Sequence, residues 1–390
     1  MHRGVAIVGI GQTFHKARRP DVNVGEMIKE AVDEALKDAQ LTLKDIDAVL
    51  LSDMDLFEGD YLSDLMWGDY AGAYLKPSLK VNTGGTTGGS AVIAGWDHVA
   101  SGLYDVVLTV TYQKLDSPID SQSCMITVWD PTYDRDFATG AIGALCQMAQ
   151  RYAAETGCPE EAVAMCRVRA DQNALRNPNA HLKLSLTVEK VMNSRMVAYP
   201  MRLAHICPNS CGACALVLAS AEKARKISNK PVWIKDHVTV HQESYTPICV
   251  IGPTPSPATQ TVAAKKLYSR NSITNPARDT QVFEIYDPTS FQQLDWLEAY
   301  LICEKGEAWK KELKGFWDLE GEYPVNPSGG VVATNPIGAT GMIRVAEAAL
   351  QIRGDAGEHQ VPREVKRALA SIWGGTNWSI LILLTKLLND

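Results

Sequence analysis

The sequence predicts a layered α/β fold assembled from two similar halves. Short apolar runs alternate with longer stretches whose apolar residues recur at helical spacing, and this alternation is typical of layered α/β proteins. Two helices are led by glycines, from Gly89 to Gly102 and from Gly341 to Gly354, and in both cases the two glycines are thirteen positions apart. Strand, glycine turn and matched helix therefore occur in the same order twice, which indicates a duplicated unit.

The first half contains one periodic stretch, one glycine cluster and several apolar runs. Residues 24–39 carry apolar residues at helical spacing and should form a helix. The glycine cluster at 82–89 should open the helix that ends near Gly102, because glycine permits a tight strand-to-helix turn. The expected strands are 5–9, 46–51, 105–110 and a buried run that opens at Cys214.

The second half is expected to repeat this plan. Strands are expected at 231–240 and 281–285, and the cluster 338–341 should open a helix that closes at Gly354. The last apolar run, 380–384, is short enough to be a buried strand or a helix end.

The order of these elements sets the expected division of the chain. The N-terminal half should span residues 1–225 and the C-terminal half residues 226–390. The stretch from about 112 to 200 is expected to be an inserted loop region of the first half.

Composition excludes several classes of protein. The 390 residues are 46% apolar and 21% charged, which is ordinary for a globular protein with a substantial core. The net charge is −7 without any basic cluster, so a nucleic-acid-binding surface is disfavoured. No apolar run reaches the roughly 18 residues of a membrane span, and the first residues lack a signal-peptide cleavage pattern. We therefore expect a cytoplasmic protein that binds neither nucleic acid nor membranes.

The nine cysteines do not indicate a disulfide framework, because their number is odd and the chain is large. Cys207, Cys211 and Cys214 form C-x3-C-x2-C, a spacing that iron–sulfur proteins also use. Ligands of a cluster normally lie on a loop, whereas Cys214 opens an apolar run that should be a strand. Buried thiols are the preferred interpretation over a metal site.

The two glycine-led helices allow two interpretations. Their free N-terminal N–H groups can converge on one point and hold a carbonyl oxygen as it becomes negative. The glycines can equally serve only the tight turns that precede the helices. The glycines alone do not decide between these two roles.

A longer motif identifies a family resemblance. Residues 323–330 read YPVNPSGG and residues 335–341 read NPIGATG. Together they resemble the C-terminal signature of thiolases in the archaeal and sterol-carrier-type branch, P-x-N-x-x-G-G followed by G-H-P-x-G-A-T-G. Further blocks agree in order, so that the resemblance runs from about residue 4 to residue 385; they are 177–180, 200–202, 207–210 and 374–375. It implies the thiolase fold, with two α/β halves in a five-layered αβαβα arrangement, and chemistry on acyl-CoA thioesters.

Three central positions depart from the family pattern. The nucleophilic cysteine of A-C-A-S-G-G becomes Gly85, and the histidine of G-H-P becomes Asn335. The histidine of E-x-H-D becomes Tyr286. Thiolysis through an acyl-enzyme needs a thiolate that a base activates, and neither partner stands at its usual place.

Three functions remain open after these replacements. In the first, the chain is a thiolase whose thiol comes from elsewhere, and Cys124 is the candidate because it lies on a polar connection; a buried structural role is the alternative. In the second, it is an aldolase that cleaves a 3-hydroxyacyl-CoA without a covalent step, with Tyr286 in acid–base work, as in steroid side-chain aldolases. Tyr286 can instead be a packed tyrosine. In the third, the chain is a non-catalytic CoA-binding scaffold.

The tryptophans suggest the acyl group. Trp129, Trp373 and Trp378 should lie near the site, where aromatic side chains pack well against an aromatic or polycyclic acyl group, although core packing explains some of them. In these tryptophans and in the missing cysteine, the chain resembles the thiolase-like subunits that cleave 2-benzoylsuccinyl-CoA to benzoyl-CoA and succinyl-CoA in toluene degradation. That resemblance implies a homodimer core and a small partner with an OB fold and a zinc ribbon.

The resemblance to thiolases also implies the roles of the site residues. The thioester should lie against Gly85, Thr86 and Gly374, with Cys124 or a free CoA thiolate attacking the keto carbon. Asn335 should hold the departing enolate, and Tyr286, or a water that it orients, should protonate it. Coenzyme A is expected as cosubstrate, without a covalently bound cofactor or a metal in this chain.

Overall fold

A computed structural model of the chain describes residues 3–116, 119–129, 131–132, 135–137, 140–241, 258–374 and 378–390. Cys249 and Gly375 lie outside these residues.

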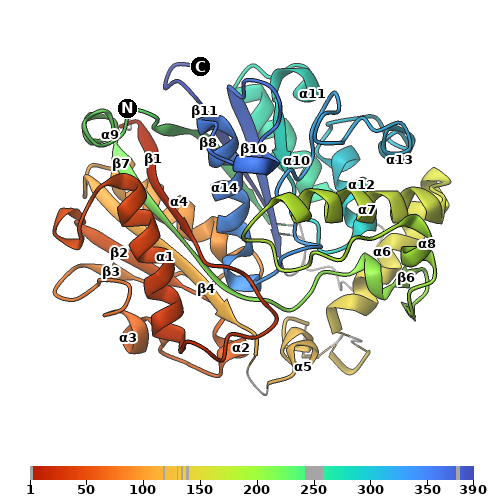
Figure 1. The fold of residues 1–390 in the computed structure, drawn as a ribbon, viewed down its shortest axis with the longest axis horizontal. Helices are drawn as coiled ribbons and strands as arrows, with labels where there is room; N and C mark the ends of the chain where they lie inside the picture. Colours follow the sequence, from red (N-terminus) through yellow and green to blue (C-terminus); the bar gives the residue numbers. More distant parts are fainter. Residues whose placement is uncertain are drawn as a thin grey trace.

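Strands from both halves join in one large mixed sheet (Figure 1). Within the described residues its order is β3-β2-β4-β7-β1-β8-β11-β10-β9. The strands of the first half are β1 (Val5–Gln12), β2 (Ala48–Ser52), β3 (Ser78–Leu79), β4 (Val106–Lys114) and β7 (Cys211–Ser220). Those of the second half are β8 (Val232–Val240), β9 (Val282–Glu284), β10 (Arg367–Gly374) and β11 (Trp378–Thr385). A separate small hairpin contains β5 (Met196–Ala198) and β6 (Met201–Arg202).

The two halves use the same strand pairing. In the first, β4 is parallel to β2 and antiparallel to β7, which is in turn antiparallel to β1. In the second, β10 is parallel to β9 and antiparallel to β11, which is antiparallel to β8. Within the described sheet, the two halves are hydrogen-bonded to each other through β1 and β8, where Ala6 pairs with Trp233 and Ile7 with Val232. This repetition is what a duplicated unit produces, and the boundary between 225 and 226 stays a prediction.

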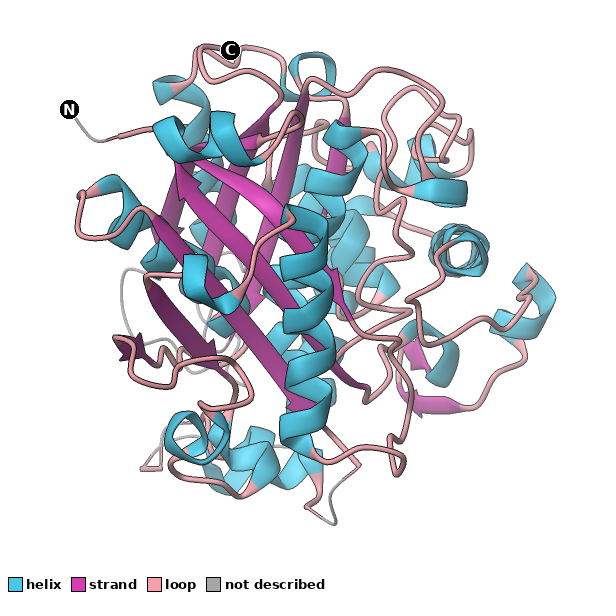
Figure 2. Ribbon diagram, turned by 60° about the vertical axis from the view of Figure 1, so that its left-hand side comes forward, coloured by secondary structure: helices cyan, strands magenta, loops and turns pink. Residues whose placement is uncertain are grey.

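Helices lie on the outer side of each half of the sheet, and two further helices lie between the halves. Helix layers and sheet layers therefore alternate in five layers. Helix α1 (Val24–Ala39) packs on the outer face of β1 and β7, as Figure 2 shows, and α10 (Ala258–Arg270) packs on β8 and β11. The glycine-led helices α4 (Thr87–Ala100) and α14 (Ile337–Arg353) pack against each other between the two halves. The alternation in β1 follows this layering, because Val5 and Ile7 belong to the central core and Ala6 and Val8 to the core beneath α1.

The remaining helices are short or belong to the region between β4 and β7. The short ones are α2 (Asp55–Glu58), α3 (Ser63–Trp67), α9 (Ala221–Ile227), α11 (Pro276–Asp279), α12 (Ser290–Ala299) and α13 (Ala308–Glu312). Single 3₁₀ turns are η1 (Leu43–Asp45), η2 (Arg135–Phe137), η3 (Leu203–His205) and η4 (Gly357–His359). Within the described ranges, no helix is long and apolar enough to cross a membrane.

The region from about 112 to 200, expected as an inserted loop region of the first half, contains several helices between β4 and β7. It contains α5 (Ser121–Ile126), α6 (Gly140–Thr156), α7 (Glu160–Arg176) and α8 (Val188–Met192). In α6 the buried residues Leu145, Ala149 and Tyr152 recur at helical spacing, and both α6 and α7 pack on α12 of the second half. This apolar face, buried against α12, is what holds the segment in helices.

The glycines of α4 and α14 permit the contact between these two helices. A Cβ added to Gly88 would lie 2.4 Å from the backbone nitrogen of Met342, and one added to Gly341 would lie 2.8 Å from the nitrogen of Gly89. Neither backbone can retreat, because each helix is held between the halves. These glycines therefore serve close helix packing, a role that differs from the two that the sequence suggested.

Replacing Gly88 with alanine is expected to lower the free energy of unfolding by about 1–3 kcal/mol, because the added methyl group overpacks a contact between two backbones. Gly89→Ala is the matched control, since its Cβ would meet only the Ile372 side chain, at 3.1 Å, and a side chain can shift. Urea unfolding of both variants measures the difference. Equal stabilities would contradict this account of the contact.

Candidate active site

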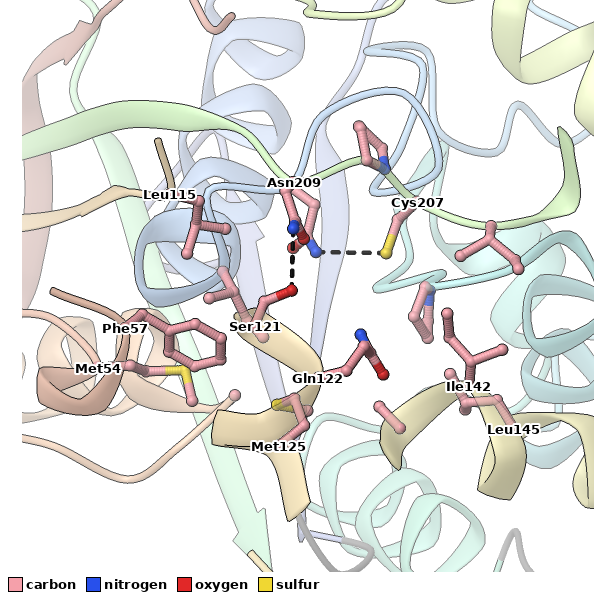
Figure 3. A pocket seen from close by; sticks show the side chains of 18 of the residues that line it. Met54, Phe57, Leu115, Ser121, Gln122, Met125, Ile142, Leu145, Cys207 and Asn209 are labelled. Atoms are coloured by element: carbon pink, nitrogen blue, oxygen red, sulfur yellow. Dashed lines mark hydrogen bonds between the residues drawn. The ribbon is translucent and has the colours of Figure 1, made fainter. Parts of the chain in front are cut away.

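A cavity of about 500 Å³ opens where the start of α4, the end of β10 and the segments before β7 and α14 meet. Gly85, Gly374, Tyr286 and Asn335 all line it, so four of the six predicted site residues come together. Cys207, which the sequence analysis assigned no role in the site, lines it as well, and Figure 3 shows its sulfur directed into the cavity.

The rest of the wall is mainly apolar. Few ionisable side chains line the cavity; in the described part of the chain they are Asp120, Arg195, Cys207 and Tyr286, with no histidine. The apolar lining comes from both halves and from α5 and α6 (Figure 3): Met54, Phe57, Leu115, Met125, Val128, Ala141, Ile142, Leu145, Val197, Leu203, Ile206, Pro208, Pro288, Ile337 and Trp373. A wall of this kind suits a bulky apolar group with a few polar contacts.

The floor of the cavity consists of two glycines in backbone contact. A Cβ on Gly85 would lie 2.9 Å from the Cα of Gly374 and 3.1 Å from the carbonyl oxygen of Trp373. A Cβ on Gly374 would lie 2.5 Å from the backbone nitrogen of Thr86. The floor therefore has no room for a side chain at 85, the position where the family pattern has its cysteine. Thr86 itself is buried behind Gly374 and does not line the cavity.

Tyr286 stands on a rigid segment that follows β9. Its backbone nitrogen donates to the Ser371 hydroxyl at 3.0 Å. Two residues earlier, Glu284 forms a buried ion pair with Arg344 at 2.5 Å. One residue later, Asp287 accepts a hydrogen bond from the Val331 nitrogen at 2.6 Å. Anchors on both sides fix the direction in which the tyrosine points.

The Tyr286 hydroxyl has no hydrogen-bond partner among the described residues, although the side chain is only 3% exposed. It lies 3.8 Å from the place where a Cβ of Gly85 would stand, and so faces the glycine floor. Burial raises the pKa of this hydroxyl, which therefore keeps its proton at neutral pH. A protonated hydroxyl that lines a cavity and faces its floor is suited to donating a hydrogen bond to a substrate oxygen.

Asn335 presents its amide nitrogen to the cavity in a fixed orientation. The Thr340 hydroxyl donates to Oδ1 at 2.9 Å, and the backbone nitrogen of Asn335 donates to the Ser210 hydroxyl at 3.0 Å. With Oδ1 occupied, Nδ2 faces the Cys207 sulfur at 3.3 Å. Ser210 and Cys207 are 125 and 128 residues away from Asn335 in the sequence, so their approach to it is a property of the fold.

Cys207 lies on the loop before β7, and its backbone nitrogen donates to the Pro288 carbonyl at 3.0 Å. The side chain is partly exposed. Burial, and to a smaller degree the charge of Asp287, raise the pKa of the thiol to about 12. Cys207 is therefore a neutral thiol at pH 7. Cys207 begins the block 207–210, which is part of the family resemblance, although no role was predicted for the cysteine itself.

Cys124 is not brought to these residues. It is 9% exposed on α5, and its thiol donates to the Leu56 carbonyl at 3.3 Å. Ser121, Gln122 and Met125 of the same helix line the cavity in its place. Burial raises the pKa of the Cys124 thiol, which does not favour a nucleophile. The role of Cys124 as nucleophile therefore stays a prediction without support from the geometry.

The cysteine triplet does not converge. Cys211 and Cys214 both lie in β7 but face opposite sides of the sheet, one in the core under α1 and the other in the central core. Over the described ranges, no group of three His, Cys, Asp or Glu side chains could hold a metal ion. Of the three tryptophans expected near the site, Trp373 lines the cavity, whereas Trp129 and Trp378 do not.

Comparisons with known proteins agree with this arrangement. Residues 255–386 match a family model described as thiolase C-terminal domain-like. An acetyl-CoA acetyltransferase from Methanothermobacter thermautotrophicus is 33% identical over 367 residues, covering 92% of this chain and 93% of that protein. The benzoylsuccinyl-CoA thiolase subunit BbsB from Thauera aromatica is 28% identical over 386 residues, covering 96% of each chain. A solved structure, the Ltp2-ChsH2(DUF35) aldolase, has a similar fold, with a TM-score of 0.85, 24% identity and 99% of each chain covered.

Proposed function

Because this chain belongs to the thiolase superfamily, in its archaeal and sterol-carrier-type branch, we propose that it cleaves a bulky β-ketoacyl-CoA with coenzyme A as cosubstrate. Membership in the family makes the chain an acyltransferase acting on CoA thioesters. The observation that carries the proposal is the apolar cavity in which Tyr286, Asn335 and the glycine floor meet.

The proposed reaction places the thioester carbonyl of the substrate against Gly85 and Gly374. The floor has no room for a cysteine there, so a CoA thiolate attacks the keto carbon directly. The bond between the keto carbon and the α-carbon breaks, and its electron pair is delocalised onto the thioester oxygen as an enolate. Tyr286 and the amide of Asn335 donate hydrogen bonds to that oxygen, which stabilises the charge in a site with little water.

The walls of the cavity support an aromatic acyl group as the substrate. Trp373 and the apolar side chains of α5 and α6 offer contact surface to a ring. Arg195 also lines the cavity, with its charge exposed, and can pair with a carboxylate carried by the acyl chain. A substrate such as 2-benzoylsuccinyl-CoA, which yields benzoyl-CoA and succinyl-CoA, has both a ring and a free carboxylate.

The surface around β3 supports a homodimer core. β3 is the edge strand of the sheet, and an edge strand exposes unpaired backbone groups. Exposed apolar side chains are concentrated in the same stretch, at Tyr61, Leu62, Leu65, Met66, Tyr74, Leu75 and Leu79. Such a concentration is typical of a protein interface. We also propose a small partner with an OB fold and a zinc ribbon that binds to this dimer. The chain would then be one subunit of a larger enzyme.

The test is to incubate the protein, together with its partner, with 2-benzoylsuccinyl-CoA in the presence and absence of free CoA. We expect one CoA to be consumed for each substrate cleaved and two acyl-CoA products to form. Cleavage that proceeds equally well without CoA would contradict thiolysis.

Retro-aldol cleavage of a 3-hydroxyacyl-CoA is the second candidate. It is favoured by the replacement of the family's histidine by Tyr286 and by a described cavity lining without histidine. Aldol cleavage needs a tuned acid and base but no nucleophile. Here a 3-hydroxyacyl-CoA would be cleaved to an aldehyde or ketone and one acyl-CoA, and no CoA would be consumed.

A further inference from the structure

We propose that the Cys207 thiol is the catalytic acid that protonates the α-carbon of the enolate. This inference rests on the proposed function, because it concerns the enolate that carbon–carbon cleavage releases. It assigns to Cys207 the step that the sequence suggested for Tyr286.

The contact between Cys207 and Asn335 is the first argument. An asparagine amide nitrogen carries two hydrogens, and one of those on Asn335 Nδ2 is directed at the Cys207 sulfur, 3.3 Å away. The second remains available for an oxygen in the cavity. An enolate oxygen that accepts this second hydrogen is bound to the same nitrogen atom as the Cys207 sulfur. The α-carbon next to that oxygen then lies within reach of the S–H group.

Among the described residues that line the cavity, the other ionisable groups are placed for other tasks. The Asp120 carboxylate caps α5 by accepting from the nitrogen and hydroxyl of Ser123, and these hydrogen bonds lower its pKa. It is therefore an ionised acceptor at neutral pH. Arg195 is exposed, and its guanidinium offers a positive charge that can pair with an anionic group of the substrate.

Tyr286 is the remaining ionisable side chain in the described lining of the cavity, and its hydroxyl faces the glycine floor, where the carbonyl oxygen of the thioester should lie. The Tyr286 side chain is only 3% exposed, and its hydroxyl lies 3.8 Å from the position that a Cβ of Gly85 would occupy, so it can donate to an oxygen that lies on the floor. The two donors thus divide the work, with Tyr286 on the oxygen and Cys207 on the carbon.

The proton balance of the cycle closes with CoA as the only co-reactant. The S–H bond of Cys207 breaks, its proton joins the α-carbon, and a Cys207 thiolate remains. The next CoA thiol to enter has a pKa near that of an ordinary thiol, roughly 8.5. Because the pKa of Cys207 is about 12, its thiolate removes the proton from CoA. This step restores the acid and generates the CoA thiolate that attacks the next substrate.

The test measures proton exchange at the α-carbon, which needs neither carbon–carbon cleavage nor a second CoA. The assembled enzyme is incubated with succinyl-CoA or acetyl-CoA in D2O over a series of increasingly alkaline pD values, because removal of an α-proton requires the thiolate form of Cys207. Deuterium in the acyl group is followed by mass spectrometry. We expect the wild-type enzyme to incorporate deuterium and Cys207→Ala to do so at least about a hundredfold more slowly, the usual contribution of a general acid or base. Cys207→Ser, which keeps the size of the side chain, should lose exchange as well.

Cys146→Ser is the matched control, because Cys146 is buried on α6 outside the cavity lining with its thiol donating to the Ala198 carbonyl at 3.3 Å, and it should exchange at the wild-type rate. The dissociation constant for the thioester, measured by calorimetry, should change less than threefold in the Cys207 variants. Exchange retained in Cys207→Ala, or absent from the wild-type enzyme with both thioesters, would overturn the proposal. Failure of the proposed function is seen separately, in the CoA-consumption assay.

Discussion

Replacing Tyr286 with phenylalanine is expected to lower kcat roughly a hundredfold or more while changing KM much less. Removing a single donor from an oxyanion site typically costs about 10²–10³ in kcat. The tyrosine hydroxyl fits this role because it is buried and has no partner among the described residues. Phenylalanine removes one oxygen and nothing else, since the segment is held by its own backbone and by the carboxylates on either side.

Steady-state kinetics of this variant should be compared with those of Tyr268→Phe. The Tyr268 hydroxyl donates to the Tyr300 carbonyl at 2.9 Å and does not line the cavity. Its loss should cost about 1 kcal/mol of stability and leave kcat unchanged. If Tyr286→Phe keeps kcat within threefold of wild type, the tyrosine only packs, and the donor to the oxygen must be sought elsewhere in the cavity.

Local sequence signals predicted the central elements of the fold well. Helix α1 spans the expected residues, Val24 to Ala39, because local interactions define both its ends. Asn23 and Glu26 form a reciprocal capping box, and Gln40 ends the helix in a left-handed conformation. α4 and α14 also begin near their glycine clusters, where the sequence expected them. Such signals require only neighbouring residues, and so they can be read from a sequence.

The inward-facing side chains were harder to predict, because they depend on contacts across the molecule. Cys124 was chosen as the candidate nucleophile because it lies on a polar connection, but that connection is a helix, and one turn of helix decides which residues face the cavity. Cys207 was grouped with Cys211 and Cys214 by spacing alone. Its partners, Asn335 and Pro288, are about 80 or more residues away in the sequence. No local pattern reports such a contact.

The family resemblance predicted more of the site than composition or periodicity did. It pointed to Gly85, Tyr286 and Asn335, and all three line one cavity. It could not say what the replacements do together, because that depends on geometry. The glycine at 85 leaves room for Trp373 and Gly374 to approach α4, so the loss of the cysteine and the shape of the floor are one structural change.

Restoring the family's cysteine with Gly85→Cys is therefore expected to lower activity about a hundredfold instead of creating an ordinary thiolase. The added Cβ would stand 2.9 Å from the Cα of Gly374 and 3.1 Å from the Trp373 oxygen, and both are backbone atoms. The floor has to move, and a displacement of about 1 Å at a reacting centre can cost about 10²-fold in rate. The overpacking should also lower the free energy of unfolding by about 1–3 kcal/mol.

Two further variants separate the effect of volume from that of the thiol. Gly85→Ala carries the same Cβ without sulfur and should lose about as much activity as Gly85→Cys. Gly84→Asn changes the preceding residue, which has a φ of 64° and open space around its Cβ, and asparagine tolerates that left-handed conformation. It should fold and turn over like the wild type. Measurements of kcat and of urea unfolding for the three variants test whether the floor can accept a side chain at 85. A stable Gly85→Cys enzyme that forms an acyl-cysteine at 85 would contradict a closed floor. The thiol could act there only if Gly374 had moved aside without cost in free energy.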